Sequence, residues 1–383
     1  QSPWDIVIVD EVHHLQPDSA EFALVEQLAA KTEHVIFLSA TPDRDGEKAH
    51  FQRLALLDPA RFYDFGVYNN ESAHYRELAT AAERLADGEP LAAEDHALFK
   101  ERLTEVDFDV LSTIQGKRKL LARLLDLHGV GRVMFRNVRA RIPGFPRRSL
   151  QVAELAGGNV ERLRREFLAD IARDDSFRFV GAQVDPRTSW LANFLAEHSG
   201  EKVLVLCADR AKVEAFYEAL VTPKRKIARF HEAMGTIERD RQAAWFLEED
   251  GPQVVISSAI GAEGRNFQVA RHLVLLDLPL DADRLEQSIG RVDRIGQGVE
   301  VHIYPLVAAG TPQARLCRWY TEALAVFDRP WHGSPVIGRE FGAVLMEALL
   351  AADEQAIESL ITKGRKRNAE IVAELEAGRD RLL

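Results

Sequence analysis

The sequence predicts an α/β protein in which parallel strands are covered by helices on both faces. Short, almost uniformly apolar runs recur, and each is followed by turn residues and then by a helical pattern. Uniform runs of this kind are typical of strands buried on both faces, which is the environment of a parallel sheet. One group of runs lies before residue 40 and the other after residue 200, and together they cover residues 6–9, 35–38, 203–206, 254–256 and 273–276.

The two groups of strands predict two lobes of unequal size. Two parallel strands do not make a stable sheet by themselves, so we expect the first lobe to be incomplete and the chain to be a fragment of a longer protein. Between the groups the sequence predicts helices, and Val184-Asp185-Pro186-Arg187 is interpreted as a hinge. The expected domains are the end of the first lobe at 1–70, a helical insertion and basic linker at 71–184, the second lobe at 185–330 and a helical C-terminal segment at 331–383.

The composition favours a protein of a reducing cytoplasm. The 383 residues include only two cysteines, Cys207 and Cys317, which cannot form a disulfide framework and lack the spacing of metal ligands. No apolar run approaches the ~20 residues that a membrane span requires. The first residues contain no basic region followed by an apolar stretch, so we expect no signal peptide there.

The charge distribution is compatible with one basic cleft. The net charge of −11 argues against a surface coated for nucleic-acid binding, but the distribution of charge matters more than its sum. We expect Arg136 and Arg139 to contact DNA phosphates, and a solvated basic linker is the alternative interpretation. Both belong to the stretch 132–148, which contains no acidic residue and six arginines: Arg132, Arg136, Arg139, Arg141, Arg147 and Arg148.

An acidic pair follows the first predicted strand. Asp10 and Glu11 come directly after residues 6–9, and the carboxyl end of a strand is where α/β folds place ligands. We expect Asp10 and Glu11 to form the Mg²⁺ site, with Asp10 holding the ion through water and Glu11 also polarising the water that attacks a γ-phosphate. A solvated acidic loop is the alternative interpretation.

Small hydroxyl residues follow the second predicted strand, in Ser39-Ala40-Thr41-Pro42. Ser39 and Thr41 could hydrogen-bond the acidic pair and so couple it to the state of a bound nucleotide. An ordinary strand end with a helix N-cap is the alternative interpretation.

A pair of arginines follows the last predicted strand, in Gln287-Ser288-Ile289-Gly290-Arg291-Val292-Asp293-Arg294. Arg291 and Arg294 are three residues apart, so on a helix they share one face. Two guanidinium groups on one face suit the charge that spreads over a triphosphate in the transition state. Gly290 would allow another backbone to approach closely. A surface helix with Arg–Glu pairs is the alternative interpretation.

A loop rich in serine and glycine follows the strand at 254–256. It reads Ser257-Ser258-Ala259-Ile260-Gly261-Ala262-Glu263-Gly264-Arg265-Asn266. Such a loop can present backbone N–H groups to the phosphates of a nucleotide or of DNA. We expect Ser257 and Ser258 to contact the DNA backbone, and Gly264 and Asn266 to lie at the nucleotide.

Taken in order, these segments resemble the motifs of the superfamily-two helicase-like ATPases. Residues 10–13 are similar to motif II, 39–41 to motif III, 257–266 to motif V and 287–294 to motif VI. The ending Arg-Val-Asp-Arg-Ile-Gly-Gln resembles the Swi/Snf branch, whose sixth motif reads Q-x-x-G-R-x-x-R-x-G-Q. The resemblance implies two RecA-like parallel-sheet lobes, the first incomplete, with helical insertions. It also implies that Gln287 joins the two arginines in catalysis and that Gly290 lies at the nucleotide.

Several longer strings narrow the resemblance to the RapA family of bacterial RNA polymerase-associated ATPases. They include Phe-Arg-Asn-Val-Arg at 135–139, Gly-Phe-Pro-Arg-Arg at 144–148, and Gly-Arg-Asp-Arg-Leu-Leu at 378–383. One departure is that the chain contains no G-x-x-x-x-G-K-[ST] phosphate loop. In the family this loop precedes motif II, so its absence fits a fragment, which alone should not hydrolyse ATP efficiently.

The resemblance implies an ATP-dependent translocase on double-stranded DNA that uses ATP and Mg²⁺. Its implied partner is RNA polymerase, which it would release from stalled or post-termination complexes for reuse; no membrane partner is implied. Two alternatives remain: an RNA helicase or restriction-type motor of the same superfamily, and a non-catalytic polymerase-binding fragment.

Overall fold

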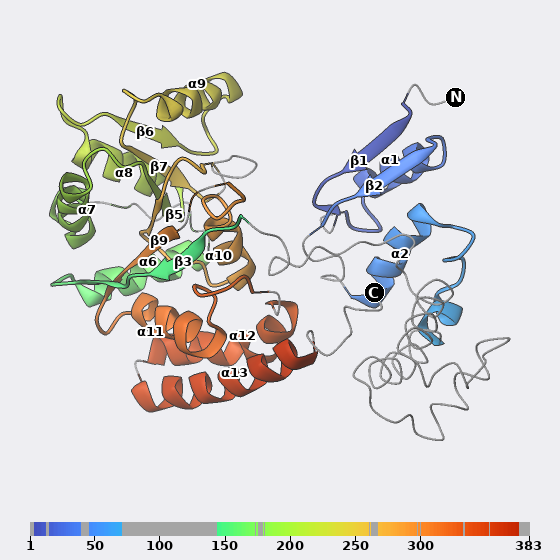
Figure 1. Cartoon of the computed structure of the whole chain (residues 1–383). Helices are drawn as coiled ribbons and strands as arrows, with labels where there is room; N and C mark the ends of the chain where they lie inside the picture. Colours follow the sequence, from blue (N-terminus) through green and yellow to red (C-terminus); the bar gives the residue numbers. More distant parts are fainter. Residues whose placement is uncertain are drawn as a thin grey trace, which may run out of the picture. The chain divides into compact units, whose positions relative to one another are not determined.

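A computed structural model describes most of the chain outside residues 71–143 (Figure 1). The chain divides into two compact units, residues 1–137 with 371–383, and residues 138–370. Among the described residues, no helix has both the length and the apolarity needed to cross a membrane. The described residues are 4–12, 15–39, 46–70, 144–172, 174, 179, 181–259, 261, 267–296, 298, 300–331, 334–351 and 353–374.

The described part of the first unit contains a pair of parallel strands, with a helix between them and another after them. Strand β1 (Ile6–Val9) pairs with β2 (His34–Phe37), and helix α1 (Ala20–Ala29) connects them. The Ser19 hydroxyl accepts a hydrogen bond from the Phe22 N–H at 3.1 Å, which caps α1. Helix α2 (Glu47–Leu57) follows. The expectation of strands buried on both faces is wrong for the described part of this unit, because exposed and half-buried residues alternate along both strands.

The second unit is built on a sheet of seven parallel strands, in the order β3-β9-β8-β5-β7-β6, with β4 also pairing β9. Strands β5, β7 and β8 are buried at every residue, as their uniform apolarity predicts. The strands are β3 (Arg147–Leu150), β4 (Ala153–Leu155), β5 (Val203–Cys207), β6 (Ile227–Phe230), β7 (Val254–Ser258), β8 (His272–Leu275) and β9 (Glu300–Ala308).

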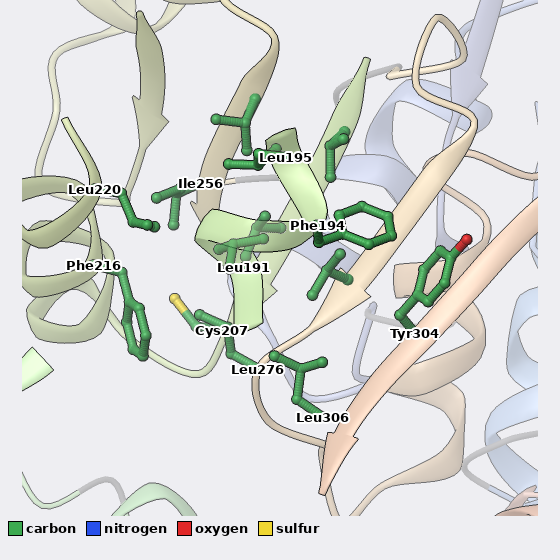
Figure 2. Close-up of a cluster of buried hydrophobic side chains, with 14 of the residues drawn as sticks. Leu191, Phe194, Leu195, Cys207, Phe216, Leu220, Ile256, Leu276, Tyr304 and Leu306 are labelled. Carbon is green, nitrogen blue, oxygen red and sulfur yellow. The ribbon is translucent and has the colours of Figure 1, made fainter. Parts of the chain in front are cut away.

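Helices cover this sheet and enclose its core. Figure 2 shows Leu191 and Phe194 of α7 and Phe216 of α8 packed against strand residues such as Ile256 and Leu306. Burial of these side chains is the main stabilising contribution to the unit. The helices are α6 (Val160–Ala172), α7 (Pro186–Glu197), α8 (Arg210–Leu220), α9 (Thr236–Leu247), α10 (Ala282–Ile289) and α11 (Pro312–Arg318), with the 3-10 turn η5 (Ala182–Val184).

The described residues of the C-terminal segment are largely helical, as predicted. A π-helix, η6 (Trp319–Leu324), follows α11 directly, and α12 (Ser334–Ala351) and α13 (Glu354–Glu374) come after it. A Cβ atom at Gly364 of α13 would lie 2.4 Å from the Trp319 ring, so only glycine allows this close approach. The Asn368 amide donates to the carbonyls of Ala323 and Leu324, which ties α13 to the end of η6.

The second sheet begins earlier in the chain than the sequence indicated. Strands β3 and β4 lie within the expected basic linker at 71–184 and pair with β9 instead. Neither strand is uniformly apolar, so the pattern that identified the other strands missed them. The proposed hinge is also wrong, because Asp185 and Arg187 are 1% and 4% exposed and lie in the interior of the unit. The α/β class with parallel sheets and C-terminal helices is confirmed.

Candidate functional site

The arginine pair lies in turns after helix α10 rather than on the helix. Helix α10 ends at Ile289, and Gly290 forms its C-cap. The Arg291 N–H donates to Ser288 O at 3.2 Å, and the Val292 N–H donates to Ile289 O at 3.1 Å. These bonds span three residues, so they tighten and end the helix. The expectation that the two arginines share a helical face is therefore wrong.

The second arginine of this turn, Arg294, is nevertheless accessible from solvent. Arg294 is exposed, and its Nε donates to Gly290 O at 3.1 Å. Arg291 is half-buried and Gln287 is exposed at the end of α10. A Cβ at Gly290 would contact only backbone atoms of Glu286 and Gln287 within 4 Å, so among the described residues no second segment makes the predicted close approach.

A buried arginine that the sequence analysis assigned to the basic linker anchors this turn. Arg148 of β3 donates from Nη1 and Nη2 to both carboxylate oxygens of Glu286, at 2.9 and 2.5 Å. Its Nε donates to Asp293 Oδ2 at 2.7 Å, and Nη1 also donates to Val326 O at 2.9 Å. Bidentate Arg–carboxylate pairs fix geometry as well as adding energy. Glu286 immediately precedes the motif 287–294 and Asp293 lies between its two arginines, so Arg148 holds both the end of α10 and the arginine turn.

Burial disfavours the charge on Arg148, but the carboxylates of Glu286 and Asp293 outweigh this effect and raise its pKa. The Arg148 side chain is 2% exposed, so it is not available to nucleic acid. Its neighbour Arg147 is 79% exposed and pairs with Glu300 at 2.6 Å. Arg136 and Arg139 lie outside the described residues.

The two serines at the end of β7 are also buried. Ser257 and Ser258 are both 0% exposed, because they end a central strand of the sheet. The Ser258 hydroxyl donates to Glu232 Oε2 at 2.7 Å and accepts from the Gly261 N–H at 3.0 Å. The expected contact of these two hydroxyl groups with the DNA backbone is therefore wrong in this structure.

The loop after β7 joins the arginine turn through its far end. The Phe267 N–H donates to Arg291 O at 3.2 Å. A Cβ at Gly261 would lie 2.8 Å from the Cα of His231, so glycine is needed where this loop passes the end of β6. Gly264 and Asn266, the residues predicted to lie at the nucleotide, are outside the described residues.

The acidic pair lies in the first unit, at the carboxyl end of β1. Asp10 and Glu11 are exposed, and Asp10 Oδ1 accepts a hydrogen bond from the Glu11 N–H at 2.9 Å. Glu11 has φ of 50°, a left-handed conformation that is strained for a residue other than glycine. Strain of this kind is concentrated at functional sites. The exposed carboxylate oxygens are donors that Mg²⁺ prefers, so the residues present fit that ion.

The ends of β1 and β2 are joined by backbone hydrogen bonds. The Leu38 N–H donates to Val9 O and the Val12 N–H donates to Leu38 O, both at 2.9 Å. This brings half-buried Ser39 to the strand end that carries the acidic pair. Thr41 is outside the described residues. Asp10 and Glu11 belong to one unit and Arg291 and Arg294 to the other, so a single triphosphate pocket lined by all four stays a prediction.

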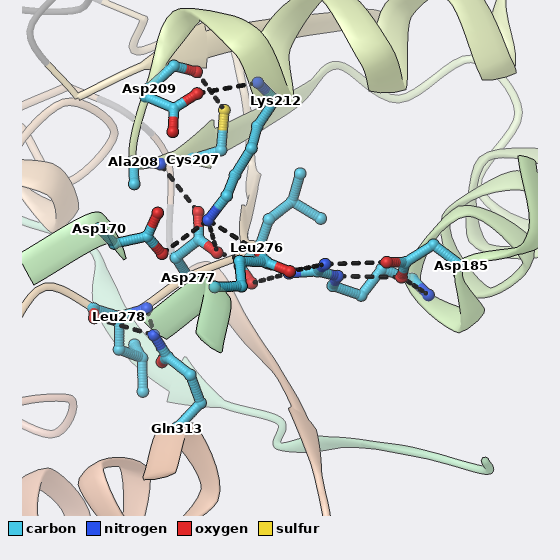
Figure 3. Close-up of polar contacts among 12 residues, drawn as sticks. Asp170, Asp185, Cys207, Ala208, Asp209, Lys212, Leu276, Asp277, Leu278 and Gln313 are labelled. Carbon is cyan, nitrogen blue, oxygen red and sulfur yellow. Dashed lines mark hydrogen bonds and ion pairs between the residues drawn. The ribbon is translucent and has the colours of Figure 1, made fainter. Parts of the chain in front are cut away.

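A buried network of charges, which the sequence analysis missed, lies at the carboxyl ends of β5 and β8 (Figure 3). Lys212 donates to Asp277 at 2.8 Å and to Asp170 at 2.6 Å, and the Ala208 N–H donates to the second oxygen of Asp277 at 2.8 Å. Asp277 directly follows Leu276 after an apolar strand, so the strand-end pattern that identified Asp10 could have found it.

The network extends to α6 and α7. Arg187 donates to both oxygens of Glu166, at 2.8 and 2.9 Å, and to Asp185. Burial, and then the charge of Asp277, raise the pKa of Asp170 to about 8. The network fixes the segment that leads from β8 into α10, and thereby the helix that precedes the arginine turn.

Two adjacent parts of the chain match models of known protein families. Residues 187–296 match the family described as helicase conserved C-terminal domain, and residues 299–383 match RNA polymerase recycling family C-terminal. A Sulfolobus solfataricus SWI2/SNF2 ATPase core in complex with dsDNA aligns over 92% of this chain and 74% of its own, at 15% identity and a TM-score of 0.37.

Two curated relatives match along the whole chain. The RNA polymerase-associated protein RapA of Pseudomonas putida (strain W619) is 41% identical over 99% of this chain and 42% of its own length. The protein of that name from Vibrio parahaemolyticus serotype O3:K6 is 38% identical over 100% of this chain and 43% of its own length. The chain thus spans less than half the length of these relatives. The chain is thus RapA-like along its whole length, with a region similar to the SNF2-type helicase C-terminal domain at 187–296 and a region similar to the RNA polymerase recycling family at 299–383.

Proposed function

We propose that this chain forms part of an ATP-driven motor that moves along double-stranded DNA and promotes the release and recycling of RNA polymerase. Support for the polymerase comes from the names of its relatives, RNA polymerase-associated protein RapA, and from the recycling family matched by residues 299–383. Support for double-stranded DNA as the polymer along which the motor moves comes from the sequence of residues 287–297, which resembles motif VI of the Swi/Snf branch. ATP is the proposed substrate, with Mg²⁺ as its cofactor.

In this proposal the two units carry different parts of the chemistry. Asp10 would hold the hydrated metal ion, and Glu11 accepts a hydrogen bond from the attacking water and orients it towards the γ-phosphate. Mg²⁺, when bound, would supply positive charge to the phosphates of ATP. Arg291 and Arg294 stabilise the negative charge that develops on the transferred phosphoryl group.

The observation that carries this proposal is the anchoring of the arginine turn. Arg148 binds Glu286 just before the motif and Asp293 within it, and the Phe267 N–H donates to the backbone of Arg291, yet Arg294 stays exposed. A charged group held in place before the reaction stabilises developing charge without reorganisation, which is the main source of electrostatic catalysis. A solvated surface loop has no need of such buried anchoring.

The proposed role of Arg294 is tested by Arg294→Ala in the complete protein encoded by the gene that contains this chain. We expect ATP hydrolysis stimulated by double-stranded DNA to fall about 10³-fold, with little change in DNA affinity. The matched control is Arg284→Ala, which removes an exposed arginine of the preceding helix α10 and should leave hydrolysis unchanged. Loss of DNA binding with hydrolysis retained would contradict the assignment of Arg294. Stimulation of the unaltered protein by RNA rather than duplex DNA would favour the RNA helicase alternative.

A further inference from the structure

Two histidines and a glutamate gather at the amino ends of β5 and β8, the sheet edge opposite the strand ends that carry the predicted motifs. His198 is the C-cap of α7, Glu201 lies in the turn before β5, and His272 is the first residue of β8. One nitrogen or oxygen atom of each side chain lies within 4.8 Å of the corresponding atoms of the other two. The side chains of His272 and Glu201 are 5% and 47% exposed, so the group lies at the edge of the core.

The ring of His198 is oriented with one nitrogen committed to the backbone. Its Nδ1 lies 3.0 Å from Phe194 O, and a carbonyl oxygen can only accept, so Nδ1 carries the proton in the neutral ring. The lone pair is therefore on Nε2. Phe194 stacks on the ring at 4.1 Å, and the Gln253 amide donates to His198 O at 2.8 Å. A metal-ligating histidine ordinarily donates its second ring N–H to an acceptor of this kind.

His272 has partners that suit either neutral tautomer. Its Nε2 hydrogen-bonds the Glu201 carboxylate, and its Nδ1 lies 3.3 Å from the Tyr304 hydroxyl oxygen. With its proton on Nδ1, the ring donates to Tyr304 and offers the Nε2 lone pair.

We propose that His198 Nε2, His272 Nε2 and one Glu201 carboxylate oxygen bind a single divalent transition-metal ion, for which zinc fits this donor set best. Two imidazoles and one carboxylate form a common zinc ligand set, with a fourth position left to water. The ion takes the place of the proton shared by His272 and Glu201, and that proton moves to His272 Nδ1. Donors around one zinc lie about 3.3 Å apart, so the three groups close by at most roughly 1.5 Å.

A second cluster, made of three acidic side chains, is also close enough to hold a metal ion but is already occupied by a cationic side chain. Among the described residues, Glu166, Asp170 and Asp277 are also close enough to share an ion. The ammonium group of Lys212 already lies 2.8, 2.6 and 2.8 Å from the three carboxylates, so a cationic side chain fills that position. Beside the histidine cluster, the nearest lysine in sequence, Lys202, instead donates to the carbonyls of Glu248 and Pro252.

The position of the site indicates a structural role that is independent of the proposed motor function. The ion would join the end of α7 to the starts of β5 and β8, so it would bind the folded chain and not the unfolded one. Binding of this kind raises the free energy of unfolding in proportion to the logarithm of free metal concentration. Cys207 and Cys317 are both buried, so their thiols do not compete for added zinc.

The test compares zinc binding by the unaltered chain with binding by His198→Gln and Glu201→Gln, two variants at partly exposed positions. Zn²⁺ is titrated against a chromophoric chelator, and thermal unfolding is followed with Zn²⁺ and with EDTA. We expect the unaltered chain to bind one more tightly held ion than either variant, each of which loses at least about 100-fold in affinity at that site. Zinc should raise the Tm of the unaltered chain but not that of either variant. In EDTA all three proteins should have the same Tm.

Two further variants separate a metal site from a hydrogen-bonded cluster. His302→Gln is the matched control, because His302 stacks on His272 at 5.3 Å but lies outside the donor set, so zinc affinity should be retained. Tyr304→Phe removes the second partner of His272 and should lower affinity about 10-fold. Equal zinc binding by the unaltered chain and the His198 and Glu201 variants would overturn the proposal. So would a loss in His302→Gln as large as that in His198→Gln.

Discussion

The two parallel sheets of this chain have strands of similar composition and very different surroundings. Strand β1 reads Ile-Val-Ile-Val and β5 reads Val-Leu-Val-Leu-Cys. Every residue of β5 is buried, whereas Ile6 and Ile8 of β1 are 46% and 58% exposed. A uniformly apolar run therefore predicts a parallel strand, but the number of neighbouring strands and covering helices determines how much of it is buried.

The same contrast separates the two groups of residues that would form the two halves of the predicted site. In the first unit Asp10 and Glu11 are exposed at a strand end. In the second unit Arg294 is exposed, but it depends on the buried guanidinium of Arg148. We therefore expect a substitution in the first half to change chemistry alone, and one in the support of the second half to change stability as well.

The largest effect is expected from Glu11→Gln in the complete protein encoded by the gene. Glutamine keeps the size of the side chain but is not a base, so ATP turnover should fall about 10²- to 10⁴-fold while ATP still binds. Because Glu11 is exposed, the free energy of unfolding should stay unchanged. Steady-state ATP hydrolysis and chemical denaturation measure the two quantities. Glu33→Gln, at an exposed position of the same unit, is the control, and unchanged turnover in Glu11→Gln would remove Glu11 from the mechanism.

The next largest effect is expected from Arg148→Ala. Removing the guanidinium leaves Asp293 and Glu286 without their cation, and breaking a buried ion pair in this way costs about 3–5 kcal/mol in the free energy of unfolding. Arg147→Ala, at the adjacent exposed position of the same strand, should cost less than about 1 kcal/mol. Urea denaturation of the 383-residue chain distinguishes them. Similar losses in both variants would mean that Arg148 does not anchor the turn.

The fold was predictable where the pattern is local. All five apolar runs identified in the sequence correspond to strands, for example 203–206 to Val203–Cys207. Strand β3, Arg-Arg-Ser-Leu, was missed because it lies at the end of the sheet order, where a strand does not need two apolar faces. Its membership of the sheet depends on pairing with β9, more than 150 residues later, which no local pattern contains.

The candidate site was predictable in part for the same reason. The strand-end pattern found Asp10, and spacing found Arg291 and Arg294, although their turn replaces the expected helix. Arg148 could not be recognised as an anchor, because its partners Glu286 and Asp293 lie 138 and 145 residues away. Two neighbouring arginines, one 79% and one 2% exposed, look alike in the sequence, since only the tertiary structure distinguishes a solvated charge from a buried one.

The smallest effects are expected from substituting an isoleucine in each sheet, and their comparison tests the difference in burial between the sheets directly. Ile256 of β7 is 0% exposed and Ile8 of β1 is 58% exposed. Ile256→Ala removes buried methyl groups and leaves a cavity, so the free energy of unfolding of the second unit should fall by about 2–5 kcal/mol. Ile8→Ala in the 383-residue chain should cost less than about 1 kcal/mol, because its side chain is already largely in water.

Repeating the Ile8→Ala substitution in the complete protein sharpens this comparison. If further strands or helices cover β1 there, the cost should rise towards that of Ile256→Ala, because burial sets the energy of the same side chain. Hydrogen exchange at the amides of β1 and β7 measures the stability of each unit separately. A large cost for Ile8→Ala already in the 383-residue chain would show that β1 is covered without any additional segment, and the contrast between the two sheets would then be wrong.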